Sequence, residues 1–207
     1  NLETLRQRGV HVVGPEEGDM ACGGDGLGRL SELDDIAAAV SDFFQSSAPL
    51  SGRRALVTSG PTHEPIDPVR YIANRSSGRQ GHAIAAALAS RGATTTLVSG
   101  PTNLPDPPGV TVVRVESARD MLAACEAALP ADVAVCAAAV ADWRVAREAN
   151  EKLKKNGAGP PSLEMAENPD ILATLAAATN TRPRLVIGFA AETEQVVEHA
   201  RTKRDRK

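Results

Sequence analysis

The chain has 207 residues, a net charge of −3 at pH 7 and only 2% aromatic residues. The negative balance excludes a broad basic face for nucleic acid, and the scarcity of aromatic rings argues against capture of single strands by base stacking. Hydrophobic residues make up 42%, and much of that share is alanine, so we expect helices packed closely on a sheet around a core of small aliphatic side chains.

The cysteines and the apolar segments indicate a reduced, cytoplasmic protein. Cys22, Cys125 and Cys136 are far apart and form no C-x-x-C pair, so neither a disulfide framework nor a zinc site is expected. No apolar stretch reaches the length that crosses a membrane, and no signal peptide is visible. We therefore expect no membrane partner.

Residues 1–45 are predicted to be separate from the rest of the chain. The expected elements are a helix end, an extended stretch, a glycine-rich loop and a helix, over 1–8, 10–13, 21–29 and 32–44. Residues 46–52 (Ser-Ser-Ala-Pro-Leu-Ser-Gly) have the composition of a linker. A second domain is therefore expected over 53–207.

The second domain alternates strands and helices. Strands are predicted over 55–58, 94–98, 110–115, 133–139 and 185–189, and helices over 82–90, 118–129, 171–178 and 194–207. Strands that are apolar throughout and alternate with helices indicate a parallel sheet covered on both faces. We predict a Rossmann-like, doubly wound, mostly parallel α/β sheet, whose ligands bind at the carboxyl ends of the strands.

The connection after the first strand, over 59–81, is unusually long. It ends with Asn-Arg-Ser-Ser-Gly-Arg-Gln-Gly over 74–81, directly before a helix. Small residues and hydroxyls that open a helix favour an anion, because free N–H groups and the helix dipole point at it. The alternative is a simple helix cap with Ser76 or Ser77 at the N-cap position and no ligand.

A dinucleotide fingerprint is missing from this loop. Gly60 and Gly78 are too far apart for G-x-G-x-x-G, and the second strand ends in Ser99-Gly100 without an acid to hold a ribose. A Walker motif is also missing. A nucleoside triphosphate therefore fits the loop as well as a dinucleotide does.

Two later segments could complete a phosphate site. Small residues over 137–139 end the fourth strand, and Asp142 after them could hold Mg²⁺ that bridges phosphates, or could be a solvated loop aspartate. The basic run over 150–155 could neutralise a triphosphate, or could be a solvated face. Asp170 opens a helix and could simply cap it.

Five segments together resemble the phosphopantothenate–cysteine ligase family. They lie in the family's order at 60–78, 138–144, 151–155, 168–170 and 188–193. Residues 15–29, with Ala-Cys-Gly at 21–23, resemble the substrate flap of the flavin-dependent phosphopantothenoylcysteine decarboxylases. Many bacteria fuse the two enzymes with the decarboxylase first, which is the order found here.

The resemblance implies a two-step reaction in coenzyme A biosynthesis. The carboxylate of 4′-phosphopantothenate attacks CTP to give an acyl-cytidylate and pyrophosphate, and the amine of L-cysteine then displaces CMP. Mg²⁺ would accompany the nucleotide. The residues alone do not decide between CTP and ATP, and the preference for CTP comes from the bacterial fused architecture.

The resemblance also assigns roles to residues. Asn74 would act on the acyl-cytidylate, and Lys152 would stabilise charge on the phosphates. The implied nucleotide site comprises Ala138, Ala139, Asp142, Lys152, Pro169, Asp170, Ile171, Leu172, Phe189, Lys203 and Lys207. The implied phosphate and substrate loop comprises Gly60, Thr62, Arg70, Asn74, Ser76, Ser77, Gly78 and Gly81.

The resemblance further implies a longer parent protein. Cys22 matches the proton donor of the decarboxylases, which use FMN, but the flavin-binding body is not in this sequence. Family members continue beyond residue 207 with more sheet and a dimer-forming region, so a homo-oligomeric parent with a dimeric ligase domain is expected. The alternatives to an active ligase are a nicotinamide-dependent oxidoreductase and an inactive piece of the ligase.

Overall fold

The computed structural model describes residues 1–19, 25–46, 48–154, 162–191 and 194–207. The chain forms two compact units, Asn1–Ala48 and Pro49–Lys207. The division falls inside the segment 46–52. Among the described residues, no helix is both long and apolar enough to cross a bilayer.

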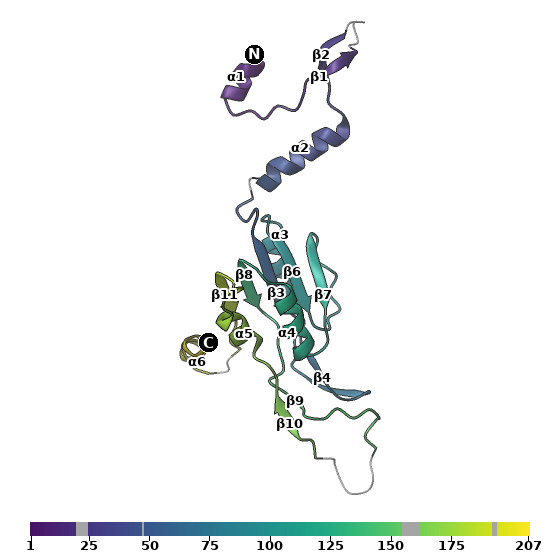
Figure 1. Cartoon of the computed structure of the whole chain (residues 1–207), viewed down its shortest axis with the longest axis vertical. Coiled ribbons are helices and arrows are strands. Elements are labelled where there is room, and N and C mark those ends of the chain that lie inside the picture. Colours follow the sequence, from purple (N-terminus) through teal and green to yellow (C-terminus); the bar gives the residue numbers. More distant parts are fainter. Residues whose placement is uncertain (20–24, 47, 155–161, 192–193) are drawn as a thin grey trace. The chain divides into compact units, whose positions relative to one another are not determined.

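The first unit is small and has little interior. Its elements are α1 (Leu2–Gln7), the antiparallel hairpin β1 (Glu16–Asp19) and β2 (Asp25–Arg29), and α2 (Leu33–Ser46) (Figure 1). Ser31 is buried, whereas Leu33 and Phe44 are exposed. The predicted loop over 21–29 is wrong in part, because residues 25–29 pair as strand β2. Cys22 lies outside the described residues.

The second unit is built on one parallel sheet (Figure 1). Its order is β11-β8-β3-β6-β7, and every neighbouring pair is parallel. The strands are β3 (Arg54–Ser59), β6 (Thr94–Ser99), β7 (Val110–Arg114), β8 (Val133–Cys136) and β11 (Leu185–Gly188). The chain runs outward from β3 to one edge and then returns to the other, so the predicted doubly wound fold is confirmed.

Helices cover both faces of this sheet. They are α4 (Ala118–Ala127) and α5 (Ile171–Ala177) on one face and α3 (Arg79–Ala89) on the other. The last helix, α6 (Val196–Arg206), follows β11 and buries none of its residues. Successive strand residues point to opposite faces: Leu56 packs in a cluster with residues of α4 and α5, and Val57 packs with Ala85 of α3. Alanine at these helix positions lets the backbone lie close to the sheet, as the composition predicted.

Two hairpins in the described part of the second unit were not predicted. One is β4 (His63–Asp67) with β5 (Arg70–Ala73), and the other is β9 (Trp143–Val145) with β10 (Met165–Glu167). The first lies inside the connection over 59–81, where prolines and charged residues gave no alternating pattern. The predicted strand over 133–139 ends at Cys136, because the next residues turn toward the loop that follows β3.

Cys125 and Cys136 belong to the core beneath α4 and α5. Burial raises the pKa of the Cys125 thiol to about 12 and that of the Cys136 thiol to about 11. A thiol reacts as its thiolate, so a raised pKa makes it unreactive near neutral pH.

We expect the core to be sensitive to truncation at Leu97, which is 0% exposed in the middle of β6. Leu97→Ala should lower the free energy of unfolding by ~2–5 kcal/mol, through lost burial and a residual cavity. Leu185→Ala, on the edge strand where the side chain is 51% exposed, is the matched control and should cost less than half as much. Urea unfolding followed by circular dichroism measures both; equal losses would contradict this description of the core.

We also expect Cys125 and Cys136 to resist alkylation in the folded chain. Iodoacetamide at pH 7.5 should leave both thiols unmodified for hours in the native chain. In about 8 M urea, which unfolds the chain, the same treatment should modify both within minutes. Peptide mapping by mass spectrometry distinguishes the two sites. Rapid modification of either in the native chain would show that it is not held in the core.

Candidate functional site

A large cleft of the second unit lies where the order of the sheet reverses. It has a volume of about 1010 Å³ and is lined by residues that follow β3 and β8 and by residues of α5 and α6. In doubly wound sheets, ligands bind at this switch point, outside the carboxyl ends of the strands. The cleft therefore has the position expected of a nucleotide site.

Hydrogen bonds fix one wall of the cleft to the loop after β3. The Thr58 hydroxyl oxygen accepts from the Ala138 N–H (3.1 Å), the Gly60 carbonyl accepts from the Ala139 N–H (2.8 Å), and the Thr62 hydroxyl oxygen accepts from the Ala141 N–H (3.0 Å). Thr62 is fully buried. These three bonds hold the backbone after β8 in one conformation.

Asn74 and Asn168 hold the same wall from the cleft side. Asn74 donates from Nδ2 to the Val140 carbonyl (2.9 Å). Asn168 donates from Nδ2 to the Ala141 carbonyl (2.8 Å) and from its backbone N–H to the Asp142 carbonyl (2.9 Å). The predicted catalytic Asn74 and the predicted metal-binding Asp142 therefore line the same cleft.

The opposite wall begins at α5. Asp170 is the N-cap of this helix, and its Oδ1 accepts from the Ala173 N–H (2.9 Å). Its other carboxylate oxygen pairs with the Lys207 ammonium. Burial alone would raise the pKa of Asp170, but the bonds from Lys207 and the Ala173 N–H outweigh burial and lower it. Asp170 is thus both a cap, as the simpler interpretation held, and a residue of the cleft.

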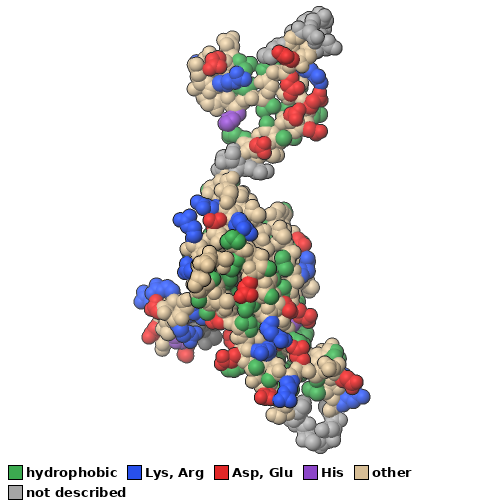
Figure 2. Space-filling view, viewed as in Figure 1, with side chains coloured by type: hydrophobic (Ala, Val, Ile, Leu, Met, Phe, Trp, Pro, Cys, Tyr) green, Lys and Arg blue, Asp and Glu red, His purple; other side chains and the backbone are tan. Residues whose placement is uncertain are grey.

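Helix α6 brings cations to the cleft. Lys203 donates to the Phe189 carbonyl (2.9 Å), and Lys207 reaches Asp170. The space-filling view shows Lys and Arg side chains gathered over this helix (Figure 2). Arg75 and Arg206 also line the cleft, as do the carboxylates of Asp142, Glu167 and Asp170. A cleft that mixes four cations with three carboxylates suits an anion accompanied by a metal ion.

Ten predicted nucleotide residues line this cleft together. They are Ala138, Ala139, Asp142, Pro169, Asp170, Ile171, Leu172, Phe189, Lys203 and Lys207. Lys152 is the exception, because it is not among the lining residues. Sequence reasoning missed Thr58, Arg75, Trp143, Asn168 and Arg206, which also line the cleft. Arg75 and Trp143 lie within the family segments 60–78 and 138–144, next to predicted site residues. That position in the sequence could have identified them as residues of the cleft.

The predicted phosphate loop packs mainly against protein. Gly78, with φ +73°, is the N-cap of α3, so the alternative of a cap by Ser76 or Ser77 is wrong. Gly81 has no room for a side chain, because a Cβ there would lie 2.5 Å from Ser59 Cβ. The hydroxyl oxygens of Ser76 and Ser77 accept from the backbone N–H groups of Gly78 (3.3 Å) and Arg79 (3.5 Å). Of this loop, only Asn74 and Arg75 are among the lining residues.

Arg70 is engaged away from the cleft. It pairs with the buried Asp67 and donates to the Leu153 carbonyl (2.9 Å). The Asp67 carboxylate accepts hydrogen bonds from this guanidinium and from backbone N–H groups. These bonds lower the pKa of Asp67 far below its usual range. The same side chains therefore hold the segment that carries Lys152.

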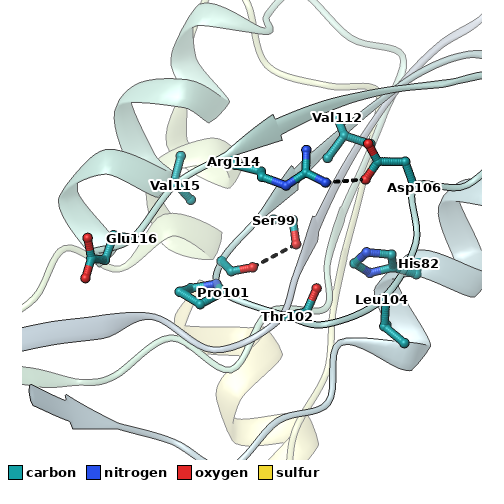
Figure 3. A pocket seen from close by; sticks show the side chains of 11 residues that line it. His82, Ser99, Pro101, Thr102, Leu104, Asp106, Val112, Arg114, Val115 and Glu116 are labelled. Carbon is teal, nitrogen blue, oxygen red and sulfur yellow. Dashed lines mark hydrogen bonds and ion pairs between the residues drawn. The ribbon is translucent and has the colours of Figure 1, made fainter.

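A second cavity of about 270 Å³ lies beside the ends of β6 and β7 (Figure 3). Figure 3 shows Arg114 paired with Asp106 at its rim and His82 among its lining residues. His82 is 7% exposed, and its Nδ1 contacts the Gly78 carbonyl (3.1 Å). Nδ1 also lies 2.9 Å from the Ser59 hydroxyl oxygen, which donates to the same carbonyl. No predicted site residue lines this cavity.

No group of three or more His, Cys, Asp and Glu side chains within the described ranges could hold a metal ion. Asp142 is exposed at the cleft and is a single carboxylate. Magnesium is commonly held by one or two carboxylates together with substrate phosphates and water. The donor set therefore fits a Mg²⁺ ion that arrives with a nucleotide, with Asp142 as its protein ligand.

Comparison with known proteins gives close relatives over the whole chain. The Coenzyme A biosynthesis bifunctional protein CoaBC of Haemophilus influenzae is 46% identical over 208 residues, which cover 100% of this chain and 52% of that protein. The protein of the same name from Escherichia coli K12 is 48% identical over 210 residues, again covering 100% of this chain and 52% of the relative. The chain thus spans about half the length of these curated relatives.

A solved structure agrees with the sequence relatives. The crystal structure of the C-terminal domain of a Coenzyme A biosynthesis bifunctional protein CoaBC is 44% identical, with a TM-score of 0.65, and the match covers 76% of this chain and 74% of that one. Residues 50–207 match the family described as DNA/pantothenate metabolism flavoprotein C-terminal domain. Because this match takes in the whole sheet and the cleft, the chain belongs to that family.

Proposed function

We propose that this chain carries the ligase part of a coenzyme A biosynthesis enzyme, which joins 4′-phosphopantothenate to L-cysteine at the expense of CTP. One observation carries the proposal: ten residues that the family resemblance assigns to the nucleotide line a single cleft at the switch point of the sheet. The two relatives at 46% and 48% identity, named for coenzyme A biosynthesis, support the same assignment.

In this proposal the nucleotide lies along the wall formed by Ala138 and Ala139, whose small side chains let it approach the backbone. The cytidine would occupy the end of the cleft formed by Pro169, Asp170, Ile171, Leu172 and Phe189. Lys203 and Lys207 would reach this end from α6, where they now rest on the Phe189 carbonyl and the Asp170 carboxylate. Mg²⁺ held by Asp142 and the phosphates would supply further charge neutralisation.

The chemistry follows from the need to activate a carboxylate. An oxygen of the phosphopantothenate carboxylate bonds to the α-phosphorus of CTP, and the bond to pyrophosphate breaks. The cysteine amine then bonds to the acyl carbon, CMP leaves with the bonding electrons, and the amine loses a proton. Asn74 stands at the cleft with its Nδ2 anchored on Val140, a position from which its Oδ1 could orient the acyl-cytidylate or the amine.

The remaining proposals concern the longer protein. We infer a cytoplasmic, homo-oligomeric parent whose ligase domain is dimeric, and whose decarboxylase uses FMN and Cys22 as proton donor. The described part of the first unit does not itself fit FMN: it has one two-stranded sheet and Ser31 as its buried residue, so it offers no enclosed surface for a flavin ring. No step of the ligation passes through that unit.

We expect CTP binding to be visible in the fluorescence of Trp143. It is the sole tryptophan, is 51% exposed and lines the cleft. Titration with CTP and Mg²⁺ should change its emission and, at ~100 times the dissociation constant, stabilise the fold by ~2.7 kcal/mol. ATP and NAD are the comparisons, and Trp143→Phe is the control for signal. Stabilisation by NAD alone would instead support an oxidoreductase. No response to any nucleotide would indicate that the chain is an inactive piece of the ligase.

We expect Lys152 and Asn74 to act on different steps. Lys152→Ala should prevent formation of the acyl-cytidylate, because charge developing on the phosphates is no longer stabilised. Asn74→Ala should form the intermediate and accumulate it. Mass spectrometry of quenched reactions with CTP, Mg²⁺, 4′-phosphopantothenate and L-cysteine separates intermediate from amide. Arg147→Ala removes an exposed cation nearby and should behave as the unchanged chain does. Equal amide yields from all four proteins would refute both roles.

A further inference from the structure

The turn between β4 and β5 is organised around one buried carboxylate. Asp67 is 4% exposed, and its Oδ1 accepts from the backbone N–H groups of Val69 (2.9 Å) and Arg70 (3.0 Å). Its Oδ2 accepts from Nε of Arg70 (3.0 Å) and also from Nη2 of that guanidinium. Charge-assisted bonds of this kind are roughly twice as strong as neutral ones. The carboxylate is therefore a fixed point of the hairpin.

The same carboxylate reaches a segment more than eighty residues away in sequence. Oδ2 of Asp67 accepts from the backbone N–H of Leu153 (3.1 Å), and Nη2 of Arg70 donates to the Leu153 carbonyl (2.9 Å). Both backbone groups of Leu153 are thus bound by one ion pair. A further bond, from the Ala149 N–H to the Ile66 carbonyl (3.0 Å), holds the start of the segment. Residues 149–153 are anchored on the hairpin at both ends.

Lys152 precedes Leu153 directly and is exposed. Each residue that becomes fixed on binding loses conformational entropy, which weakens the binding. Because the backbone of Lys152 is already ordered, ligand binding loses less of this entropy. Lys152 lies between the two anchored residues, Ala149 and Leu153, whereas Lys154 adjoins only Leu153. What the hairpin fixes is the backbone from which the Lys152 side chain leaves.

We propose that Asp67 is a positioning residue, which holds the backbone at Leu153 so that Lys152 is presented to the nucleotide phosphates. The contact of Lys152 with the phosphates rests on the proposed function, whereas the anchoring rests on the bonds at Leu153. Asp67 does not touch substrate and acts only through Arg70 and Leu153. Arg70, assigned above to the phosphate loop, has in this proposal a role in the same clamp.

The test is Asp67→Asn, with Asp106→Asn as the matched control. Asp106 forms an ion pair with Arg114 on the exposed rim of the second cavity, so its amide variant also breaks an Arg–Asp pair but leaves the hairpin intact. Native-state trypsin digestion followed by mass spectrometry measures cleavage after Lys152. Losing charge-assisted bonds worth ~1.5–3 kcal/mol should accelerate that cleavage roughly 10- to 100-fold in Asp67→Asn and leave Asp106→Asn unchanged.

A kinetic readout separates positioning from structural support. Asp67→Asn should slow acyl-cytidylate formation roughly ten-fold or more at saturating CTP and 4′-phosphopantothenate, and Asp67→Glu, which keeps the charge, should restore part of the rate. Continued protection of Cys125 and Cys136 from alkylation checks that the variant folds. If Asp67→Asn does not fold, Arg70→Lys, which keeps the charge but loses the planar fork, is measured in its place.

Unchanged cleavage after Lys152 would overturn the proposal, whatever the chain does with CTP. Faster cleavage with an unchanged rate would also overturn it, because the clamp would then order a segment that the reaction does not use. If the unsubstituted chain does not bind CTP, the proposed function and the role of Lys152 in it are refuted. The digestion would still show whether Asp67 holds the backbone at Leu153. Faster cleavage together with a slower first step supports the proposal.

Discussion

The site depends on the contact between the loop that leaves β3 and the backbone that leaves β8. The Thr58 hydroxyl at the end of β3 accepts a hydrogen bond from the Ala138 N–H. In the loop that follows, the Gly60 carbonyl accepts from the Ala139 N–H and the Thr62 hydroxyl accepts from the Ala141 N–H. All three donors are alanines, whose small side chains let the two segments approach closely. These bonds give the cleft one wall that is fixed before any ligand binds.

Electrostatics then decides what the cleft can hold. Four cations surround it, and two of them, Lys203 and Lys207, rest on protein acceptors. Such cations can exchange one acceptor for another with little rearrangement, whereas an unpaired buried cation would be costly to maintain. The carboxylates on the same walls limit the net positive charge, so a highly charged ligand fits best when a divalent ion accompanies it.

The hairpin β4–β5 holds the segment 149–153, which contains Lys152. The family resemblance assigns Lys152 to the nucleotide, although the segment lies far from the hairpin in sequence. Asp67 and Arg70 stand three residues apart and form one ion pair, yet the bonds that matter run to Leu153. Prediction from sequence treated Arg70 as a phosphate ligand and left Asp67 without a role. The pattern of the hairpin is masked by Pro65 and Pro68, which suit the turn and an edge but interrupt the alternation expected of strands.

The sequence by itself determined the doubly wound sheet and the succession of strands and helices along the chain, and the family resemblance named ten of the residues that line the cleft. It did so because apolar runs such as 55–58 and 133–136 report burial directly, and because residues that end neighbouring strands must meet at one edge of a parallel sheet. Only the tertiary structure decided that Gly78 caps α3, that Gly81 serves packing against Ser59, and that Lys152 lies outside the lining of the cleft. Those outcomes depend on distances between segments far apart in the chain, which no local pattern of residues encodes.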